Sequence, residues 1–359
     1  MARRRIRYIS PLNAGKVLAH GRYWSLPFLK LYLEGCDEKI FLEPEDGFLL
    51  AQHAPELARR IGVGGEGHYL SEREKRSWRV RALAVWGSSC RAYGELTQAE
   101  AAYRLGFELL EEGIDDESSG ELHLRAAVLA LTQAHGDAAS LVESALESFE
   151  RSAIDQKRAD ALAIRGLIKI MASDPEGLVD SARVLSLVDP GGARGRRTMV
   201  SALHNMALAA TRGTSSIEAQ DFACRLLRET KRKMASKPNS SPKMKVLWVE
   251  GLLLAKMGIT RLAEKRLARS RDGLRKLHDP FGFALASLDL VALLLGDGRG
   301  MLARLTAQET LEVVRGEMTA DEGLVDALSD WFKGGVLSIS SVHRLQDRLR
   351  GESLLPRAS

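Results

Sequence analysis

The chain contains few cysteines and no long apolar run, and both shortages restrict what it can be. Its 359 residues include three cysteines, Cys36, Cys90 and Cys224, which lie far apart and form no CxxC pair. A disulfide framework or a cysteine zinc site is therefore not expected. No run approaches the roughly 18 consecutive apolar residues that a transmembrane helix needs. We therefore expect a protein with no membrane partner.

The N-terminus, MARRRIRYIS, has the basic start of a signal peptide but lacks the apolar stretch that should follow it. Asn13, Lys16, His20 and Arg22 interrupt that stretch, so we expect a cytoplasmic protein. Hydrophobic residues make up 45% of the chain and charged residues 28%, a composition typical of folded soluble chains rather than disordered ones.

Motifs that mark common enzyme sites are also missing. The chain has no HExxH, P-loop or G-x-S-x-G pattern, and its eight histidines are scattered. GVGGEG, residues 62–67, has the spacing of a dinucleotide-binding turn, but that turn needs a preceding strand and an immediate helix. The preceding FLLAQHAPELARRI instead has a helical pattern. We therefore predict a connector there, no cofactor, no metal and no enzyme activity; EEGIDDESSGE, residues 111–121, is also expected to be a solvated connector.

What the chain does contain is a helical pattern that recurs. Apolar residues from Leu83 to Tyr93 recur every three or four positions, which predicts one helix face, and Gly94 ends that helix. A second apolar face from Leu96 to Phe107 predicts an antiparallel partner helix. Together the two segments predict a helical hairpin.

The hairpin is repeated along the chain at constant intervals. Its small and large markers Gly87, Gly94, Ala99 and Tyr103 are matched at the same spacing by Gly251, Gly258, Ala263 and Leu267. Small side chains at the marker positions allow the axes of two paired helices to approach to roughly 8–10 Å. Weaker copies carry the markers Gly166, Leu178 and Ala182; Ala207, Ala219 and Ala223; Val291, Ala303 and Ala307; and Ala126, Ala138 and Val142. FLKLYLEGCDEK and PEDGFLLAQHAPELARRIG form a degenerate first copy.

These intervals predict an all-α fold, because a single hairpin cannot bury its apolar face and must stack on a neighbour. We expect a right-handed superhelical solenoid of about seven hairpins, each roughly 35 to 44 residues long. Residues 1–25 are expected to form a basic N-terminal arm, residues 26–317 the solenoid, and residues 318–359 C-terminal capping helices and a tail. A compact helical domain without repeats is the alternative.

The markers Leu83, Trp86, Gly87, Gly94, Ala99 and Tyr103 resemble the tetratricopeptide repeat (TPR). The segment 247–299 resembles a group of bacterial TPR proteins that stand alone or are joined to regulatory domains and whose functions are mostly unassigned. The resemblance covers about residues 26–317, although Cys90 and Leu254 replace the tyrosine of the motif and Glu250 replaces a leucine. It implies a scaffold that binds a peptide or protein, without identifying that partner.

Charge is distributed unevenly along the chain. The whole chain carries +5, whereas residues 191–280 contain 20 Lys and Arg against 7 Asp and Glu, a balance of +13 that leaves −8 for the remainder. One interpretation is a set of solvated helix faces; the other is a patch that attracts an acidic partner. At a helix end, Lys231, Arg232 and Lys233 would also stabilise the terminal carbonyls without any partner.

In a solenoid the first helix of each hairpin faces the concave side, and the repeat register places candidate partner-binding residues there. These residues are Arg81, Arg91, His204, Asn205, Arg212, Lys245, Trp248 and Lys256. Basic and amide side chains suit an extended acidic segment. Local alternatives stay open: Trp248 can pack against the neighbouring hairpin, and His204 and Asn205 can hydrogen-bond nearby.

The sequence therefore predicts a non-enzymatic, regulatory scaffold or adaptor that binds a protein or peptide in a superhelical groove. The alternative is a nucleic-acid-associated transcriptional regulator that uses the basic 191–280 surface and the arm containing Arg3, Arg4, Arg5 and Arg7. That region contains few aromatic residues for base stacking, which favours the first prediction. Self-association through the repeats is a third option.

Overall fold

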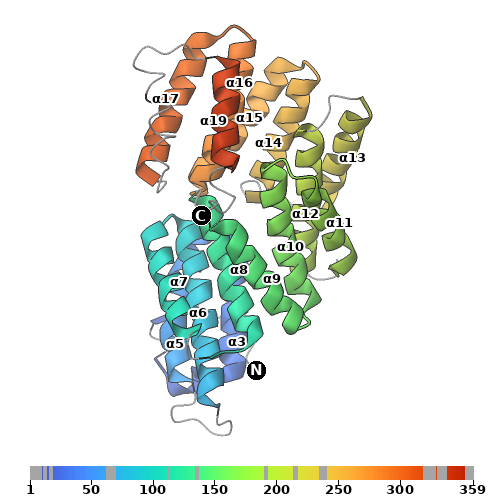
Figure 1. Cartoon of the computed structure of the whole chain (residues 1–359). Helices are drawn as coiled ribbons and strands as arrows, with labels where there is room; N and C mark the ends of the chain where they lie inside the picture. The colour runs from blue at the N-terminus through green and yellow to red at the C-terminus, as the bar shows by residue number, and fades with distance from the viewer. Residues whose placement is uncertain are drawn as a thin grey trace, which may run out of the picture. The chain divides into compact units, whose positions relative to one another are not determined.

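The computed structural model is helical throughout the part of the chain that it describes, which confirms the all-α prediction (Figure 1). A 3-10 helix, η1 (Gly21–Tyr23), precedes a series of α-helices, and the described residues contain no strand. GVGGEG and the basic residues of the N-terminal arm up to Arg7 lie outside the described residues. The structure describes residues 10, 14–15, 19–61, 70–110, 113–133, 137–189, 193–212, 217–233, 241–317, 329 and 338–351.

The chain divides into two compact units. Unit 1 comprises residues 1–129 and 144–153, and unit 2 comprises residues 130–143 and 154–359. The division runs through α8 (Asp116–Thr132) and α9 (Ala138–Arg151), so each of these two helices contributes to both units.

The degenerate first copy differs from its prediction. It contains α3 (Leu26–Leu42) as expected, but two short helices, α4 (Pro44–Ala51) and α5 (Ala54–Arg60), replace the single second helix. The break precedes Pro55, which lies in the first turn of α5. A proline lacks a backbone N–H and its ring clashes with the carbonyl four residues earlier, so a continuous helix could not pass this position undistorted. The prediction of one helix across this proline was wrong.

The strongest predicted hairpin is present in unit 1 as α6 (Glu72–Tyr93) and α7 (Leu96–Leu110). Ser71 begins α6 with a capping box, in which its side chain accepts the Glu74 backbone N–H and the Glu74 carboxylate accepts the Ser71 backbone N–H. Gly94 ends the helix in the left-handed conformation, with a φ of 100°, which glycine adopts without strain. The same helix α6 also contacts α3, α4 and α5.

Small residues lie where paired helices cross closely. A Cβ atom on Gly87 would lie 2.6 Å from the Tyr103 ring, and one on Gly251 would lie 2.7 Å from the Leu267 side chain. Ala99 and Ala263 are completely buried. The close approach predicted from the repeat markers is therefore present in both of the strong copies.

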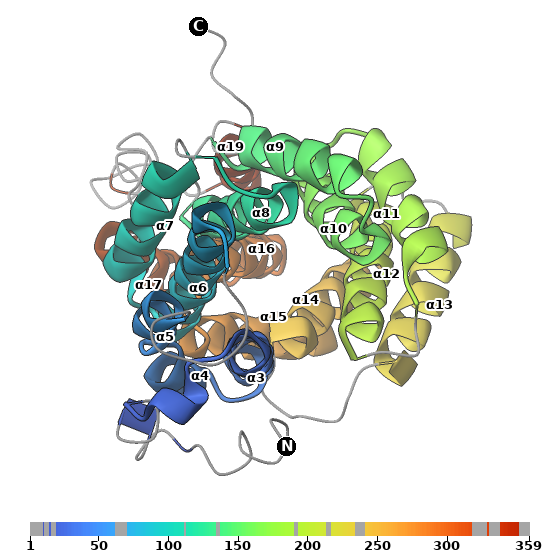
Figure 2. The same ribbon diagram turned by 90° about the horizontal axis from the view of Figure 1, so that it is seen from below.

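Unit 2 contains four successive helix pairs, of which three follow the weaker markers and one, residues 241–276, contains the strong copy from Gly251 to Leu267. Each second helix contacts the first helix of the next pair, and each first helix contacts the next first helix. In Figure 2, α11 and α13 lie together on one side of α10 and α12. The pairs are α10 (Asp155–Met171) with α11 (Glu176–Leu187), α12 (Ala193–Arg212) with α13 (Ile217–Lys233), α14 (Ser241–Lys256) with α15 (Thr260–Lys276), and α16 (Pro280–Gly296) with α17 (Gly300–Glu317).

The last described helix, α19 (Ile339–Gly351), packs against α16. Val342 and Leu345 on α19 are buried, and the Gln346 side chain donates a hydrogen bond of 2.6 Å to Asp289 on α16. Helix α19 therefore covers α16, which is the first helix of the final pair. Residues 318–328 and 330–337, where the other predicted capping helix falls, lie outside the described residues.

The polar segment 111–121 is not the solvated connector that its composition predicted, because α8 begins within it. The Asp115 carboxylate accepts the Ser118 backbone N–H at 2.7 Å and so caps this helix. Arg81 of α6 lies 3.0 Å from Asp115 and 2.8 Å from Glu117. Acidic residues at a helix start also interact favourably with the helix dipole. The acidic run therefore has a capping role.

Gly177→Ala should lower the free energy of unfolding by about 1–3 kcal/mol. The new Cβ would lie 2.7 Å from the Gly166 carbonyl oxygen and 2.8 Å from the Ile170 backbone nitrogen, and backbone atoms cannot rotate away. Gly316→Ala, at the end of α17, is the matched control because nothing lies within 4 Å of its added Cβ. Denaturant unfolding followed by circular dichroism measures both; equal losses would contradict the close crossing of α10 and α11.

Candidate functional site

Three of the eight predicted partner-binding residues are buried within unit 2. His204, Asn205 and Trp248 expose only 5%, 2% and 5% of their surface. The Asn205 amide donates to the backbone carbonyl of Ala163 on α10 at 2.8 Å, and the Trp248 indole N–H donates to Asp289 on α16 at 2.7 Å. The expectation that these three side chains face an open groove is therefore corrected: they lie inside, and two of them link neighbouring first helices.

Asp289 is the centre of this linkage. One of its carboxylate oxygens accepts the indole of Trp248 from α14, and the other accepts the amide of Gln346 from α19. Asn205 and Asp289 both stand two residues before the first marker of their repeats. The register therefore contains the signal for these links, because this position faces the preceding first helix rather than solvent.

The Arg81 guanidinium is bound by other side chains of unit 1. Its Nε donates to the Ser118 hydroxyl at 2.6 Å, its Nη2 contacts Asp115 and Glu117, and its guanidinium lies 4.4 Å from the centre of the Trp78 ring. The Arg81 side chain is only 17% exposed. Its contacts link α6 to the start of α8 and place its charge against two carboxylates of the same unit.

The pKa of Asp115 reflects this environment. Burial alone would raise the pKa of its carboxyl, but hydrogen bonds from Ser77 and Ser118 and the charge of Arg81 outweigh burial and lower it to about 2. A carboxyl with a lowered pKa stabilises the fold when ionised. This contribution is present above the ordinary value of 3.8 and is lost as the pH falls towards 2.

The four remaining predicted partner-binding residues are not enclosed as the others are, as far as their side chains are described. Arg91 on α6 is half-buried, and its Nε has no hydrogen-bond partner among the described atoms. Lys245 is half-exposed and Lys256 is exposed, both on α14. Partial burial lowers the pKa of Lys256. Arg212 ends α12, and its side chain lies outside the described part of the chain. Lys245 and Lys256 are therefore the groove candidates that stay accessible in unit 2.

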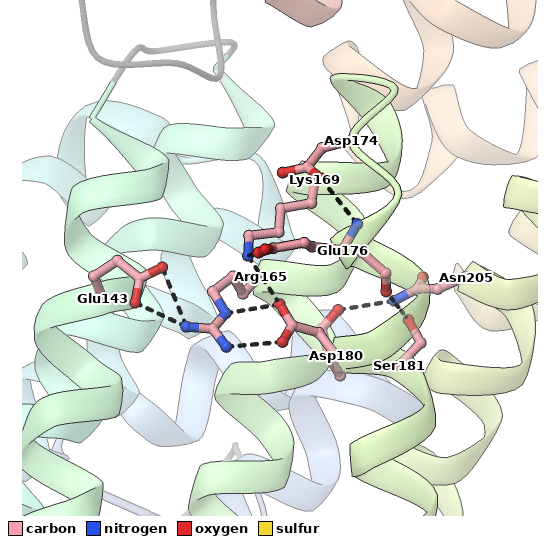
Figure 3. Close-up of polar contacts among 10 residues, drawn as sticks. Glu143, Arg165, Lys169, Asp174, Glu176, Asp180, Ser181 and Asn205 are labelled. Atoms are coloured by element: carbon pink, nitrogen blue, oxygen red, sulfur yellow. Dashed lines mark hydrogen bonds and ion pairs between the residues drawn. The ribbon is translucent and has the colours of Figure 1, made fainter.

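A charged cluster in unit 2 was missed by the sequence analysis (Figure 3). Arg165 on α10 points between Glu143 and Asp180, and binds Asp180 through two hydrogen bonds of 2.7 and 2.8 Å. Its Nη1 donates to Glu143 at 3.0 Å. The Asp180 side chain is only 3% exposed, so its charge is compensated inside the protein. A buried bidentate pair of this kind fixes the orientation of both side chains.

Lys169 adds a second cation to this cluster. Its ammonium lies 2.7 Å from Glu176 and 3.6 Å from Asp180. Burial alone would lower the pKa of Lys169, but Glu176 and Asp180 raise it above its ordinary value. Each carboxylate of the cluster therefore faces a cation, an arrangement that links helices rather than one that presents a reactive group.

A comparable cluster in unit 1 surrounds Arg125 of α8. Its two terminal nitrogens donate to the two Asp37 carboxylate oxygens at 2.8 and 2.7 Å, and its Nε donates to Glu121 at 2.9 Å. One terminal nitrogen also donates to the Ser88 hydroxyl at 3.1 Å. Burial alone would lower the pKa of Arg125, but the two carboxylates raise it well above its ordinary value. One side chain thus connects α3, α6 and α8.

Neither cluster has the composition of a metal centre, and no group of three or more His, Cys, Asp and Glu among the described residues is placed to hold a metal ion. Among the described helices, none combines the length and the apolar character that a membrane span requires. No protein-family model matches the chain, and no curated protein matches it significantly. The TPR resemblance therefore rests on the repeat markers and on helix packing.

Proposed function

We propose that this chain is a non-enzymatic scaffold or adaptor, organised as a TPR superhelix, that binds a protein or peptide partner. The packing of unit 2 carries the proposal, because each first helix contacts the next first helix and each second helix contacts the next pair. A stack of this kind displays side chains from successive repeats along one extended surface, which solenoids use for binding. The resemblance to bacterial TPR proteins suggests a regulatory role in the cytoplasm.

Lys245 and Lys256 are the residues that we assign to partner contact in unit 2, and in unit 1 we assign Arg91 to it. Their positive charge suits an acidic segment, whose carboxylates would accept charge-assisted hydrogen bonds. Asn205 and Trp248 act indirectly in this proposal, because their bonds to Ala163 and Asp289 maintain the row of first helices.

Lys245→Glu combined with Lys256→Glu should reduce recovery of the partner at least about tenfold, equivalent to about 1.4 kcal/mol of binding free energy. Both side chains reach solvent, so the melting temperature should stay close to that of the wild type. The measurement is affinity purification from native cells after nuclease treatment, with quantification of the captured protein. A nuclease-resistant partner recovered only with the lysines intact would support the groove.

Arg183→Glu combined with Arg304→Glu is the matched control, because both arginines are exposed on second helices, α11 and α17. This pair changes the net charge by the same amount as the lysine pair. If both double variants capture the partner as well as the wild type, Lys245 and Lys256 do not contact it. If both lose it equally, net charge rather than the groove determines binding.

A further inference from the structure

Helix α13 carries a stripe of basic residues on the side that points away from its hairpin. Ala223 and Leu227 are buried, whereas Arg225, Arg228 and Arg232 are exposed. Because an α-helix has about 3.6 residues per turn, these three arginines lie on the face opposite the two buried residues. The side chains of the stripe therefore extend into solvent.

Helix α15 repeats this arrangement over a longer distance. Its buried positions include Leu267 and Leu274, and its exposed basic residues are Arg261, Lys265, Arg269, Arg275 and Lys276. At about 1.5 Å per residue, the stripe from the first to the last of these extends about 22 Å. Asp272 is an acidic residue within the stripe, and Arg271 lies 2.9 Å from it.

One carboxylate of α14 connects these two helices. Glu250 lies 2.9 Å from Lys231 of α13 and 3.3 Å from Arg266 of α15. The two basic stripes therefore occur on helices that contribute to one local charge cluster of unit 2. The sequence predicted an excess of positive charge in residues 191–280, and the structure assigns much of it to these helices.

Two of the carboxylates near the stripes are already paired, whereas Asp221 of α13 is exposed and makes no ion pair with any described residue. Glu229 lies 2.7 Å from Arg232, and Glu264 lies 2.6 Å from Arg299. Within the described residues, seven exposed cations of α13 and α15 make no ion pair, and we call them the α13–α15 basic face. They are Arg225, Arg228, Arg261, Lys265, Arg269, Arg275 and Lys276. An anion from outside the chain would lower their mutual repulsion.

We propose that the α13–α15 basic face binds the phosphodiester backbone of a nucleic acid without regard to base sequence. Side chains three or four residues apart on a helix lie about 5–6 Å from one another, so a stripe can meet successive phosphates. Arginine presents a planar fork of donors that matches phosphate oxygens, and most of this face is arginine. The α15 stripe of about 22 Å corresponds to about six base pairs of duplex.

The geometry favours a nucleic acid over an acidic peptide. An extended peptide must also satisfy its own backbone N–H and C=O groups, which usually requires a sheet edge or a groove. The outer face of a helix offers neither, because its backbone groups are already paired within the helix. A phosphate backbone needs only cations. Sequence preference is not expected, because contacts from lysine and arginine to phosphates carry no sequence information.

This binding is separate from the proposed scaffold function. The basic face lies on the second helices α13 and α15, whereas Lys245 and Lys256 lie on the first helix α14. One surface can therefore be inactivated without the other, and the failure of either proposal leaves the other standing.

The test uses the full chain and fluorescence anisotropy with a labelled 20-base-pair DNA duplex and a mixed-sequence single-stranded RNA, at about 50 to 200 mM salt. The wild type should bind both, with affinity falling steeply as salt rises. The variant R225Q/R228Q/K265Q/R269Q should weaken binding at least about tenfold at low salt. Its logarithmic salt slope on the duplex should be shallower by about 3 to 4, since each lost phosphate contact contributes about 0.9.

The control variant R104Q/R183Q/R304Q/R344Q removes the same charge from exposed positions on other helices. It should bind within about twofold of the wild type, and circular dichroism should be unchanged in both variants, since glutamine is a good helix former. Equal loss in both variants would overturn the proposal in favour of diffuse net-charge attraction. Undiminished binding by the first variant would also overturn it, as would binding of poly-glutamate but not of nucleic acid.

Discussion

Replacing Arg165 with methionine should lower the free energy of unfolding of unit 2 by about 3–5 kcal/mol. Methionine fills much of the apolar volume of the arginine stem but supplies no hydrogen-bond donor. The Asp180 carboxylate, 3% exposed, would lose both of its short bonds and keep only Lys169 at 3.6 Å. A buried charge with so little compensation is among the costliest defects in a protein interior.

Two companion variants distinguish the contribution of the Arg165–Asp180 ion pair from that of the neighbouring contact with Glu143. Arg165→Met combined with Asp180→Leu removes both charges and should recover most of the loss, because replacing a buried ion pair with apolar residues is often close to neutral. Glu143→Gln should cost less than about 1 kcal/mol, because Glu143 is 51% exposed and its pair with Arg165 is screened by water. If Arg165→Met costs no more than Glu143→Gln, the Asp180 bond contributes little.

Hydrogen exchange should locate the loss. Repeats in a stack interact mainly with their nearest neighbours, so a defect on α10 should weaken protection in α10, α11 and α12 first. These are the helices that contact one another around the Arg165 cluster. Protection in α3 and α6 of unit 1 should stay at its wild-type level.

The helices could be predicted from the sequence because their signals are local. Apolar periodicity located the pairs, and the turns at Gly94 and Gly258 have the positive φ values that glycine favours, 100° and 74°. The signal for the break before Pro55 is equally local, since proline disfavours a continuous helix, but apolar residues on both sides of it continue the helical pattern. The acidic start of α8 carries an ambiguous signal, because a polar run is typical both of a connector and of a helix cap.

The contacts of the candidate site could not be predicted to the same extent, because they depend on rotations of about one residue around a helix. The repeat register identified Trp248 and Asn205 as special positions, but one helical step, about 100°, separates a groove from a neighbouring helix. Asp37 and Arg125 are 88 residues apart, and no local pattern brings them together. The charge balance of residues 191–280 predicted a basic surface, whereas its concentration on α13 and α15 depends on which side of each helix is buried.

The second large effect is expected in unit 1. Arg125→Met should lower its free energy of unfolding by about 3–5 kcal/mol, because Asp37 and the nearly buried Glu121 would both lose their cation. Arg125→Lys should restore only part of this loss. The planar guanidinium of Arg125 binds both Asp37 oxygens and Glu121 simultaneously. A lysine ammonium is a single point charge and cannot make all of these contacts at once.

Arg104→Met on α7 is the control, because Arg104 is exposed and its replacement should change stability by less than about 0.5 kcal/mol. Hydrogen exchange again supplies the decisive measurement, since Arg125 connects α8 to Asp37 of α3 and to Ser88 of α6. All three helices should lose protection together in Arg125→Met, while α14 to α17 of unit 2 keep theirs. A loss restricted to α8, with α3 protected as in the wild type, would mean that the contact with Asp37 does not stabilise the packing of unit 1.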